Sequence, residues 1–585
     1  MDKKRRIWPL IKRLLGLIKS YKRFFVISAV AVIILSFLSP LRPLLISLMV
    51  DHAIVKNQDP DYLLLFSLLI FCVLIVEGML QVFSSYFSNL LAQNVILDLR
   101  KRVFSHIFSF QPRYFEKTPV GSLVTRVVSD LEAITDVFSA GIMEIAGDIM
   151  SLGLILTLMF ATNWQLSVMT LIPIPLLLLA TKIFSRAMRS SFTKERSAVN
   201  ALNAFVQERL SGMRLVQLFN KEQKEYKAFV KLNSNHRKAH IQAIWANSIF
   251  FPVVEFLSSL SIAFLLVWGA LHAQGKTKYE VQAMYGQIVA FTLWINQLYR
   301  PIRQLADKFN ILQRGAVRAE RLFEIIDDIS EVEKTEGQTR IDFNKQISFN
   351  SVCFSYIPQQ RVIKNLSLTI NPGQTVAFVG ATGSGKTTLI SLLAKMYDYE
   401  EGEILIGGMP LKSISSAAAR KEIGIVLQDV VLFSGTILEN ITMGKQEISK
   451  EQVIEATISV GLNDFINSLP GGYDHVISER GESLSVGQRQ LISFIRAYVY
   501  NPTILILDEA TSSVDSELEY LIQQATKKLT KERTSILVAH RLSTVQSADL
   551  ICVMDNGKII QKGTHLQLIQ DVKGSYYKLC KTQFS

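Results

Sequence analysis

Residues 375–388 read TVAFVGATGSGKTT and decide the fold of the second half of the chain. The apolar run TVAFV is typical of a buried strand. It leads into residues 380–388, which fit the pattern G-x-x-x-x-G-K-[ST]. The glycines let backbone N–H groups surround phosphates, Lys386 is expected to reach the β- and γ-phosphates, and Thr387 offers its hydroxyl to Mg²⁺. The following helix, TLISLLAKMY, points its positive N-terminal end at the same phosphates.

A second motif, ILILDEA at residues 504–510, predicts a central strand that ends in acidic side chains. Asp508 can hold Mg²⁺ through water, and Glu509 is the group that would polarise an attacking water. Asp-Glu after a strand also suits the start of a helix, but a phosphate loop upstream favours the catalytic interpretation. His540, which follows another apolar strand, is expected to contact the γ-phosphate or to orient Glu509.

The first half of the chain is strongly apolar, and the whole sequence has a mean hydropathy of +0.26. A helix needs about 20 residues to cross about 30 Å of hydrocarbon, and six stretches meet that length. They are roughly 24–50, 62–90, 137–160, 163–185, 244–272 and 280–299. The sequence therefore predicts a membrane domain of six transmembrane helices over 1–325, a linker over 326–345, and an α/β P-loop nucleotide-binding domain over 346–585.

The positive charge is concentrated in the first half. The net charge is +13, with +17 in residues 1–325 and −4 in the remainder. The segments that the positive-inside rule assigns to the cytoplasm carry 34 Lys and Arg, and the intervening loops carry three. Both termini are therefore expected in the cytoplasm, and no nucleic-acid partner is expected. The four scattered cysteines argue against a disulfide framework or a zinc site.

Several acidic side chains fall inside the predicted spans, where a charge is costly and usually faces an interior or a water-filled cavity. The main ones are Glu77, Glu144, Asp148 and Glu255. Two interpretations stay open for Glu144, Asp148 and Glu255. They could meet cationic substrates, or they could serve helix–helix contacts or lie nearer the interface.

A third motif completes the pattern. LSVGQ at residues 484–488 lies between the phosphate loop and ILILDEA, and with these motifs in this order nearly the whole chain resembles an ABC exporter half-transporter of the multidrug or lipid type. The resemblance implies ATP and Mg²⁺ as cofactors. It implies adenine stacking by Tyr356, a Mg²⁺ contact from Gln428, and the acidic X-loop position for Glu479. The other nucleotide contacts that it implies are Gly380, Gly383, Ser384, Gly385, Thr388, Ser485, Gly487, Gln488 and Asp515.

The resemblance makes LSVGQ at residues 484–488 the signature loop of the family. It also implies an obligate dimer, because the signature loop of such proteins faces the γ-phosphate held by a second ATPase domain. Val486 replaces the first glycine of the common LSGGQ. A homodimer is favoured, and a heterodimer with a second half-transporter stays open. Residues 114–134 and 208–219 resemble the two intracellular loops whose coupling helices dock on the ATPase domains. Arg113, Glu116 and Arg126 would serve that docking or simple surface solvation.

The resulting expectation is an ATP-driven exporter of amphipathic small molecules or lipids in the cytoplasmic membrane, with membrane lipids around it. A peptide exporter, ATP-driven uptake, or an ATP-dependent regulator or gate of another membrane protein remain as alternatives. The sequence does not identify the substrate. Hydropathy does not show which face of each transmembrane helix lines the cavity.

Overall fold

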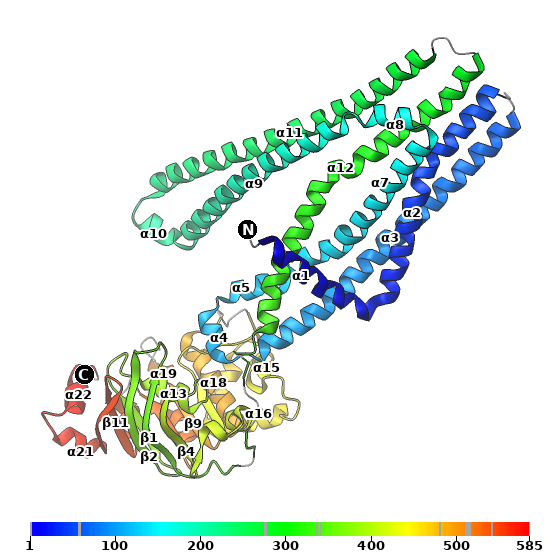
Figure 1. Cartoon of the computed structure of the whole chain (residues 1–585). Helices are drawn as coiled ribbons and strands as arrows, with labels where there is room; N and C mark the ends of the chain where they lie inside the picture. The colour runs from blue at the N-terminus through cyan, green and yellow to red at the C-terminus, as the bar shows by residue number, and fades with distance from the viewer. Residues whose placement is uncertain are drawn as a thin grey trace. The chain divides into compact units, whose positions relative to one another are not determined.

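The computed structural model describes most of the chain. The described residues are 3–56, 60–273, 278–330, 332–333, 337–339, 341–478, 481, 483–508, 516–539 and 542–583. They form two compact units, and each is described here by itself. The first holds residues 1–109 and 118–330, and the second holds 110–117 and 331–585 (Figure 1). The boundary at 330/331 falls inside the predicted linker, and a short segment of the first predicted coupling loop belongs by its contacts to the second unit.

The first unit is built from helices in its described residues, and several of them are very long (Figure 1). Their bounds are α1 Lys3–Leu17, α2 Lys22–Met49, α3 Pro60–Phe108, α5 Val120–Thr125, α6 Leu131–Asp136, α7 Met143–Thr162, α8 Trp164–Leu171, α9 Ile174–Ser211, α10 Met213–Leu218, α11 Glu222–Ala273 and α12 Lys278–Asp327.

Five helical stretches among the described residues are long and apolar enough to cross a membrane. They are Lys12–Val55, Pro60–Phe108, Val120–Thr162, Trp164–Ser211 and Glu222–His272. These stretches contain the first five predicted spans, apart from Asn163 at the start of the fourth. The sixth predicted span, 280–299, lies in α12, which is long enough but carries Gln287, Asn296 and Gln297 among its apolar residues. The sixth span therefore stays a prediction.

A proline inside α2 shows how an apolar helix satisfies its backbone. A proline has no N–H, so Pro43 leaves the carbonyl of Ser39 without its usual partner one turn later. The side-chain amide of Gln297 on α12 donates to that carbonyl at 3.2 Å. The Trp294 indole donates to the carbonyl of Pro40 at 2.9 Å. These two bonds attach α12 to the proline-containing part of α2.

The second unit contains an antiparallel sheet of four strands and a mostly parallel sheet of six, besides a two-stranded pair. The four strands run in the order β2-β1-β4-β5, and the six in the order β12-β11-β3-β10-β9-β6. Their bounds are β1 Ile347–Ser355, β2 Arg361–Ile370, β3 Thr375–Val379, β4 Glu401–Ile406, β5 Met409–Pro410, β6 Ile423–Val426, β9 Ile504–Asp508, β10 Thr534–Val538, β11 Leu550–Asp555 and β12 Lys558–Gly563; β7 Gly435–Thr436 pairs with β8 Val476–Ile477.

Side chains alternate between two cores along the central strands, because successive residues of a strand point to opposite faces. In β3, Val376 and Phe378 join the core that contains the antiparallel sheet, whereas Ala377 and Val379 join the other core. The same alternation runs along β9 and β10. A sheet covered on both faces explains why these strands are continuous apolar runs in the sequence.

Helices of the second unit follow the strands. Their bounds are α4 Pro112–Lys117, α13 Lys386–Leu393, α14 Ser416–Glu422, α15 Ile437–Thr442, α16 Lys450–Val460, α17 Asn463–Ser468, α18 Val486–Tyr500, α19 Ser516–Thr530, α20 Leu542–Gln546, α21 His565–Gln570 and α22 Ser575–Gln583. The helix predicted over TLISLLAKMY is shorter than expected. It ends at Leu393, because the chain turns at Lys395, whose φ is +55°.

Candidate functional site

The predicted phosphate loop connects β3 to α13 and depends on its glycines. Gly380 has a φ of +154°, and a Cβ there would lie 2.2 Å from the carbonyl oxygen of Met554. Gly383 and Gly385 also have positive φ, at +82° and +102°. L-amino acids with a side chain rarely adopt such backbone angles. The loop can therefore turn tightly and keep its backbone amides free of side-chain cover.

Lys386 is buried at the start of α13, and its Nζ donates to the carbonyls of Gly380 at 2.8 Å and Ala381 at 3.0 Å. Burial lowers the pKa of Lys386, and the negative charge of Asp508 opposes that change. Burial likewise raises the pKa of Asp508, against the effect of Lys386. Ser384 Oγ is buried without a hydrogen-bond partner among the described residues. A buried cation and an unpaired hydroxyl in one loop fit an anionic ligand.

The remaining described candidates gather at the carboxyl ends of the parallel strands. Asp508 is the last residue of β9, and Gln428 follows two residues after the end of β6. Thr387 is exposed in the first turn of α13. β3, β10, β9 and β6 are neighbours in one parallel sheet, and ligands of such sheets bind outside the carboxyl ends of the strands. Three predicted residues, Glu509, Asp515 and His540, lie outside the described residues, as does Glu479.

Tyr356 lies beside the loop, half exposed, and its hydroxyl donates to Thr388 Oγ1 at 3.2 Å. The structure adds a residue that the sequence reasoning missed. Tyr397 packs edge-on against Tyr356, with ring centroids 5.1 Å apart, and its hydroxyl donates to Glu116 Oε2 of α4. Burial raises the pKa of Tyr397, so its hydroxyl stays a donor at neutral pH. No motif marks Tyr397, because its partner is 281 residues away.

Of the basic residues considered for docking, Arg113 lies on the same short helix as Glu116, in the second unit. Arg126 belongs to the first unit and begins a π-helical turn, Arg126–Asp130. Glu116 therefore has a specific hydrogen-bond partner in Tyr397. This contact favours the docking interpretation of Glu116 over simple surface solvation.

The LSVGQ loop forms the N-terminus of α18. Ser485 is the N-cap: its Oγ accepts from the Gln488 backbone N–H at 3.2 Å, and its own N–H donates to Gln488 Oε1 at 2.9 Å. The Ser485 hydroxyl keeps its own hydrogen to donate elsewhere. Val486 is the first helical residue and is 46% exposed. The backbone at position 486 is therefore helical and does not need the glycine of the common LSGGQ motif. The second glycine of that motif, Gly487, is present and buried.

The four acidic residues singled out inside the predicted spans, Glu77, Glu144, Asp148 and Glu255, have basic partners in the first unit. Lys308 on α12 contacts Asp148 at 2.5 Å and Glu144 at 3.2 Å, both on α7. The other two pairs are Arg42 with Glu77 and Arg303 with Glu255, each at 3.2 Å. Lys308 is only 10% exposed, so its charge is neutralised mainly by these carboxylates. This pairing favours the helix–helix interpretation of the acidic residues.

The second predicted coupling loop contains α10, between α9 and α11. Leu215, Leu218 and Phe219 are all exposed there. Three large apolar side chains on one short helical segment form a surface of the kind that usually contacts another protein.

Comparison with known proteins covers both units. The family described as "ABC transporter transmembrane region" matches residues 25–302, and the family "ABC transporter" matches residues 363–512. An ATP-dependent lipid A-core flippase of Syntrophus aciditrophicus is 34% identical over 576 residues, which is 98% of this chain and 94% of that protein.

Two further relatives extend the comparison. A fatty acid ABC transporter ATP-binding/permease protein of Mycobacterium tuberculosis is 36% identical over 494 residues, covering 84% of this chain and 77% of that protein. A putative multidrug export ATP-binding/permease protein of Bacillus subtilis is 33% identical over 582 residues, covering 98% and 99%. The chain is an integral membrane protein that couples ATP hydrolysis to transport. It belongs to the ABC transporter family, as a half-transporter with one transmembrane region and one ATP-binding domain.

Proposed function

We propose that the protein is one half of a dimeric, ATP-driven exporter of amphipathic small molecules or lipids. It would reside in the cytoplasmic membrane with both termini in the cytoplasm, as the distribution of Lys and Arg indicates. The observation that carries the proposal is the alignment of nearly the whole chain with a lipid A-core flippase and a putative multidrug exporter. The multidrug and lipid names of these relatives share one substrate property, which is an apolar body with a polar part.

The roles of the nucleotide-site residues follow from the chemistry of phosphoryl transfer. Lys386 and the loop amides between Gly380 and Gly385 hold the phosphates. Tyr356 stacks on the adenine, a role that rests on the family resemblance. Glu509 polarises the attacking water, and His540 orients Glu509 or contacts the γ-phosphate. The burial of Lys386 supports this assignment, because a cation in a poorly solvated loop gains most from an anionic partner.

Thr387, Gln428 and Asp508 fit a Mg²⁺ ion, since hard cations take oxygen ligands such as hydroxyl, amide and carboxylate groups. When bound, Mg²⁺ would neutralise the charge that develops on the phosphates. Burial raises the pKa of Asp508, which is the expected cost of holding a carboxylate ready for a cation. Asp429, beside Gln428, adds to this increase and places a second negative charge nearby.

Two exposed surfaces support a dimer. The capped N-terminus of α18 presents the Ser485 hydroxyl and a positive helix end, which suit a phosphate held by another chain. The apolar surface of α10, formed by Leu215, Leu218 and Phe219, suits docking on an ATPase domain of the dimer. We favour a homodimer, because Val486 is compatible with the helical start of α18. A heterodimer would be indicated if the chain alone is inactive.

The decisive experiment uses the full chain purified alone and reconstituted in lipid vesicles. ATP hydrolysis is measured with and without hydrophobic cations, lipids or peptides, alongside transfer of a fluorescent lipid between leaflets and movement of a fluorescent hydrophobic cation across the membrane. Stimulated hydrolysis together with transfer supports the exporter. Hydrolysis without movement of any lipid or drug would favour the regulator or gate, and stimulation only by peptides would favour a peptide exporter. Glu509→Gln is the matched control, expected to bind ATP without turnover.

A further inference from the structure

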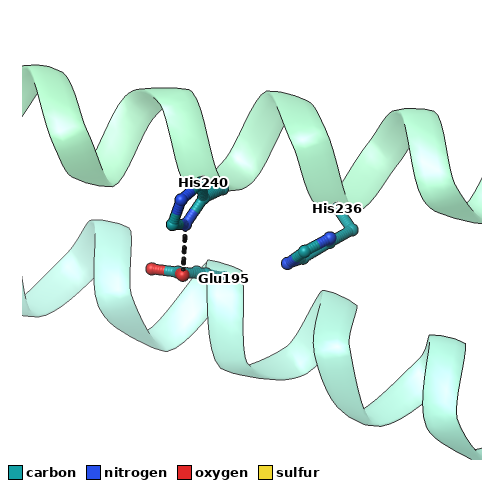
Figure 2. Close-up of side chains that lie close together, drawn as sticks. All are labelled: Glu195, His236 and His240. Carbon is teal, nitrogen blue, oxygen red and sulfur yellow. Dashed lines mark hydrogen bonds and ion pairs between the residues drawn. The ribbon is translucent and has the colours of Figure 1, made fainter.

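A cluster of metal-ligating side chains lies between α9 and α11 in the first unit. Glu195 belongs to α9, and His236 and His240 belong to α11 (Figure 2). Each offers one ligand atom, and these atoms lie within 4.8 Å of one another. The cluster is separate from the nucleotide-site residues and from the intramembrane ion pairs, and it lies outside the predicted spans 163–185 and 244–272.

The spacing of the two histidines brings their rings together. Residues four apart on a helix share one face, and the ring centroids of His236 and His240 are 5.9 Å apart. The Nδ1 atom of His240 is 2.6 Å from Glu195 Oε1. Figure 2 shows both rings extending from α11 toward the neighbouring helix that carries Glu195. Two elements distant in sequence thus contribute to one set of nitrogen and oxygen ligands.

We propose that Glu195, His236 and His240 form a binding site for a divalent transition metal, with zinc as the expected ion. Two imidazoles and one carboxylate are a common three-ligand set for zinc, with a water or another ligand in the fourth position. Calcium takes six to eight oxygen ligands, so it does not suit a site with one carboxylate. Imidazole nitrogens favour zinc over magnesium as well.

The geometry needs only side-chain adjustment. Zinc–ligand bonds of about 2.0–2.1 Å in a tetrahedral arrangement separate the ligand atoms by about 3.3 Å. Separations of up to 4.8 Å therefore have to shrink by about 1.5 Å at most, and the 2.6 Å between His240 Nδ1 and Glu195 Oε1 has to widen by about 0.7 Å if Nδ1 is the ligand atom. The proton between His240 and Glu195 has to leave Nδ1, or the ring has to turn and present Nε2. The His240 side chain is 51% exposed, which leaves a path for the ion, whereas Glu195 is 19% exposed.

The four scattered cysteines argue against a zinc site built on cysteines. The present cluster contains no cysteine, so their spacing does not bear on it. Two histidines four residues apart on a surface helix do not by themselves predict a metal site, because a third ligand is needed. The third ligand, Glu195, is 45 residues from His240 in the sequence, so only the packing of α9 against α11 reveals the set.

A bound ion would connect α9 to α11 within the helical hairpin that carries α10. Bonds to a metal would hold the two helices together more firmly than the single hydrogen bond between His240 and Glu195. The zinc-loaded hairpin would therefore be stiffer than the metal-free one. Any consequence for transport rests on the proposed function, but metal binding itself does not.

The first test measures zinc on the purified full-length protein without nucleotide. Metal is removed with a chelator, zinc is added back, and the bound metal is determined by mass spectrometry and by competition with a chromophoric chelator. We expect one zinc per chain. His236→Ala, His240→Ala and Glu195→Gln are each expected to weaken binding at least about tenfold. His52→Gln is the control, because the ring of His52 has its hydrogen bond to the Leu48 carbonyl and lies outside the cluster.

The second test replaces zinc with cobalt(II), whose visible absorption reports a tetrahedral site with nitrogen ligands. The spectrum is expected in the wild type and in the His52 variant, and not in the three site variants. Metal-free variants should melt at the wild-type temperature, and only the wild type and the His52 variant should gain stability on adding zinc. Equal zinc binding by the triple variant and the wild type would overturn the proposal, whatever the outcome of the transport assays.

Discussion

The Ser485 hydroxyl has two proposed roles: it caps α18, and it binds a phosphate held by another chain. Replacing Ser485 by alanine removes both, whereas replacing Ser449 by alanine removes only a helix cap of the same kind. Ser485 caps α18 through a reciprocal pair with Gln488, and Ser449 caps α16 through the same pair with Gln452. The corresponding backbone-to-side-chain distances are 3.2 and 2.9 Å at α18 and 3.3 and 3.0 Å at α16. The two serines thus have nearly equal structural roles, and only Ser485 belongs to the signature loop.

Loss of either cap should cost about 1 kcal/mol, which lowers the melting temperature by about 2–4 °C for a domain of this size. Ser485→Ala should lose in addition a hydrogen bond to a charged phosphate, worth about 1.5–3 kcal/mol. That loss predicts a further decrease in ATP turnover of about 10- to 100-fold. The assay compares melting temperature and ATPase rate of both variants in vesicles. Equal ATPase rates in Ser485→Ala and Ser449→Ala would refute the assigned role of Ser485.

Three other changes test separate parts of the molecule. Lys386→Ala should reduce ATP affinity at least about tenfold by removing the buried cation, measured with a fluorescent nucleotide; unchanged affinity would contradict the assignment. Gln297→Leu should destabilise the membrane unit by about 1–3 kcal/mol, because a carbonyl of α2 loses its donor. Asn296→Leu, whose amide bonds only within its own helix, is the control, and equal melting temperatures would contradict the argument. Tyr397→Phe removes the hydrogen bond to Glu116 and should lower transport per ATP hydrolysed; an unchanged ratio would count against coupling through that bond.

Local motifs predicted much of the nucleotide-binding fold. The strand over TVAFV is β3, and the strand over ILILD is β9, a central strand between β10 and β6. Such segments are predictable because a strand buried on both faces is a continuous apolar run, and a phosphate loop needs glycine at fixed positions. The five long apolar helices of the membrane domain were predictable for a similar reason, since hydrocarbon thickness sets a minimum length.

Contacts between distant segments could not be predicted. Lys308 meets Asp148 across 160 residues, and Tyr397 meets Glu116 across 281. Hydropathy locates an apolar helix along the chain but does not set its rotation, so the partner of Asp148 was not readable from the sequence. For the same reason the sequence left a substrate contact open for the acidic residues in the spans, beside a helix–helix contact or a position nearer the interface.

The length of α11 has a mechanical consequence. Its 52 residues extend about 78 Å at about 1.5 Å per residue, more than twice the hydrocarbon thickness of about 30 Å. If Pro252 inside α11 leaves the helix nearly straight, a rod of that length moves its far end by about 1.4 Å for each degree of tilt, from that same rise per residue. Displacements of several ångströms therefore need rotations of only a few degrees. During such a rotation, side chains near the fixed end of α11 move little and keep their packing contacts. A large displacement of one end of α11 is therefore compatible with nearly unchanged packing at the other end.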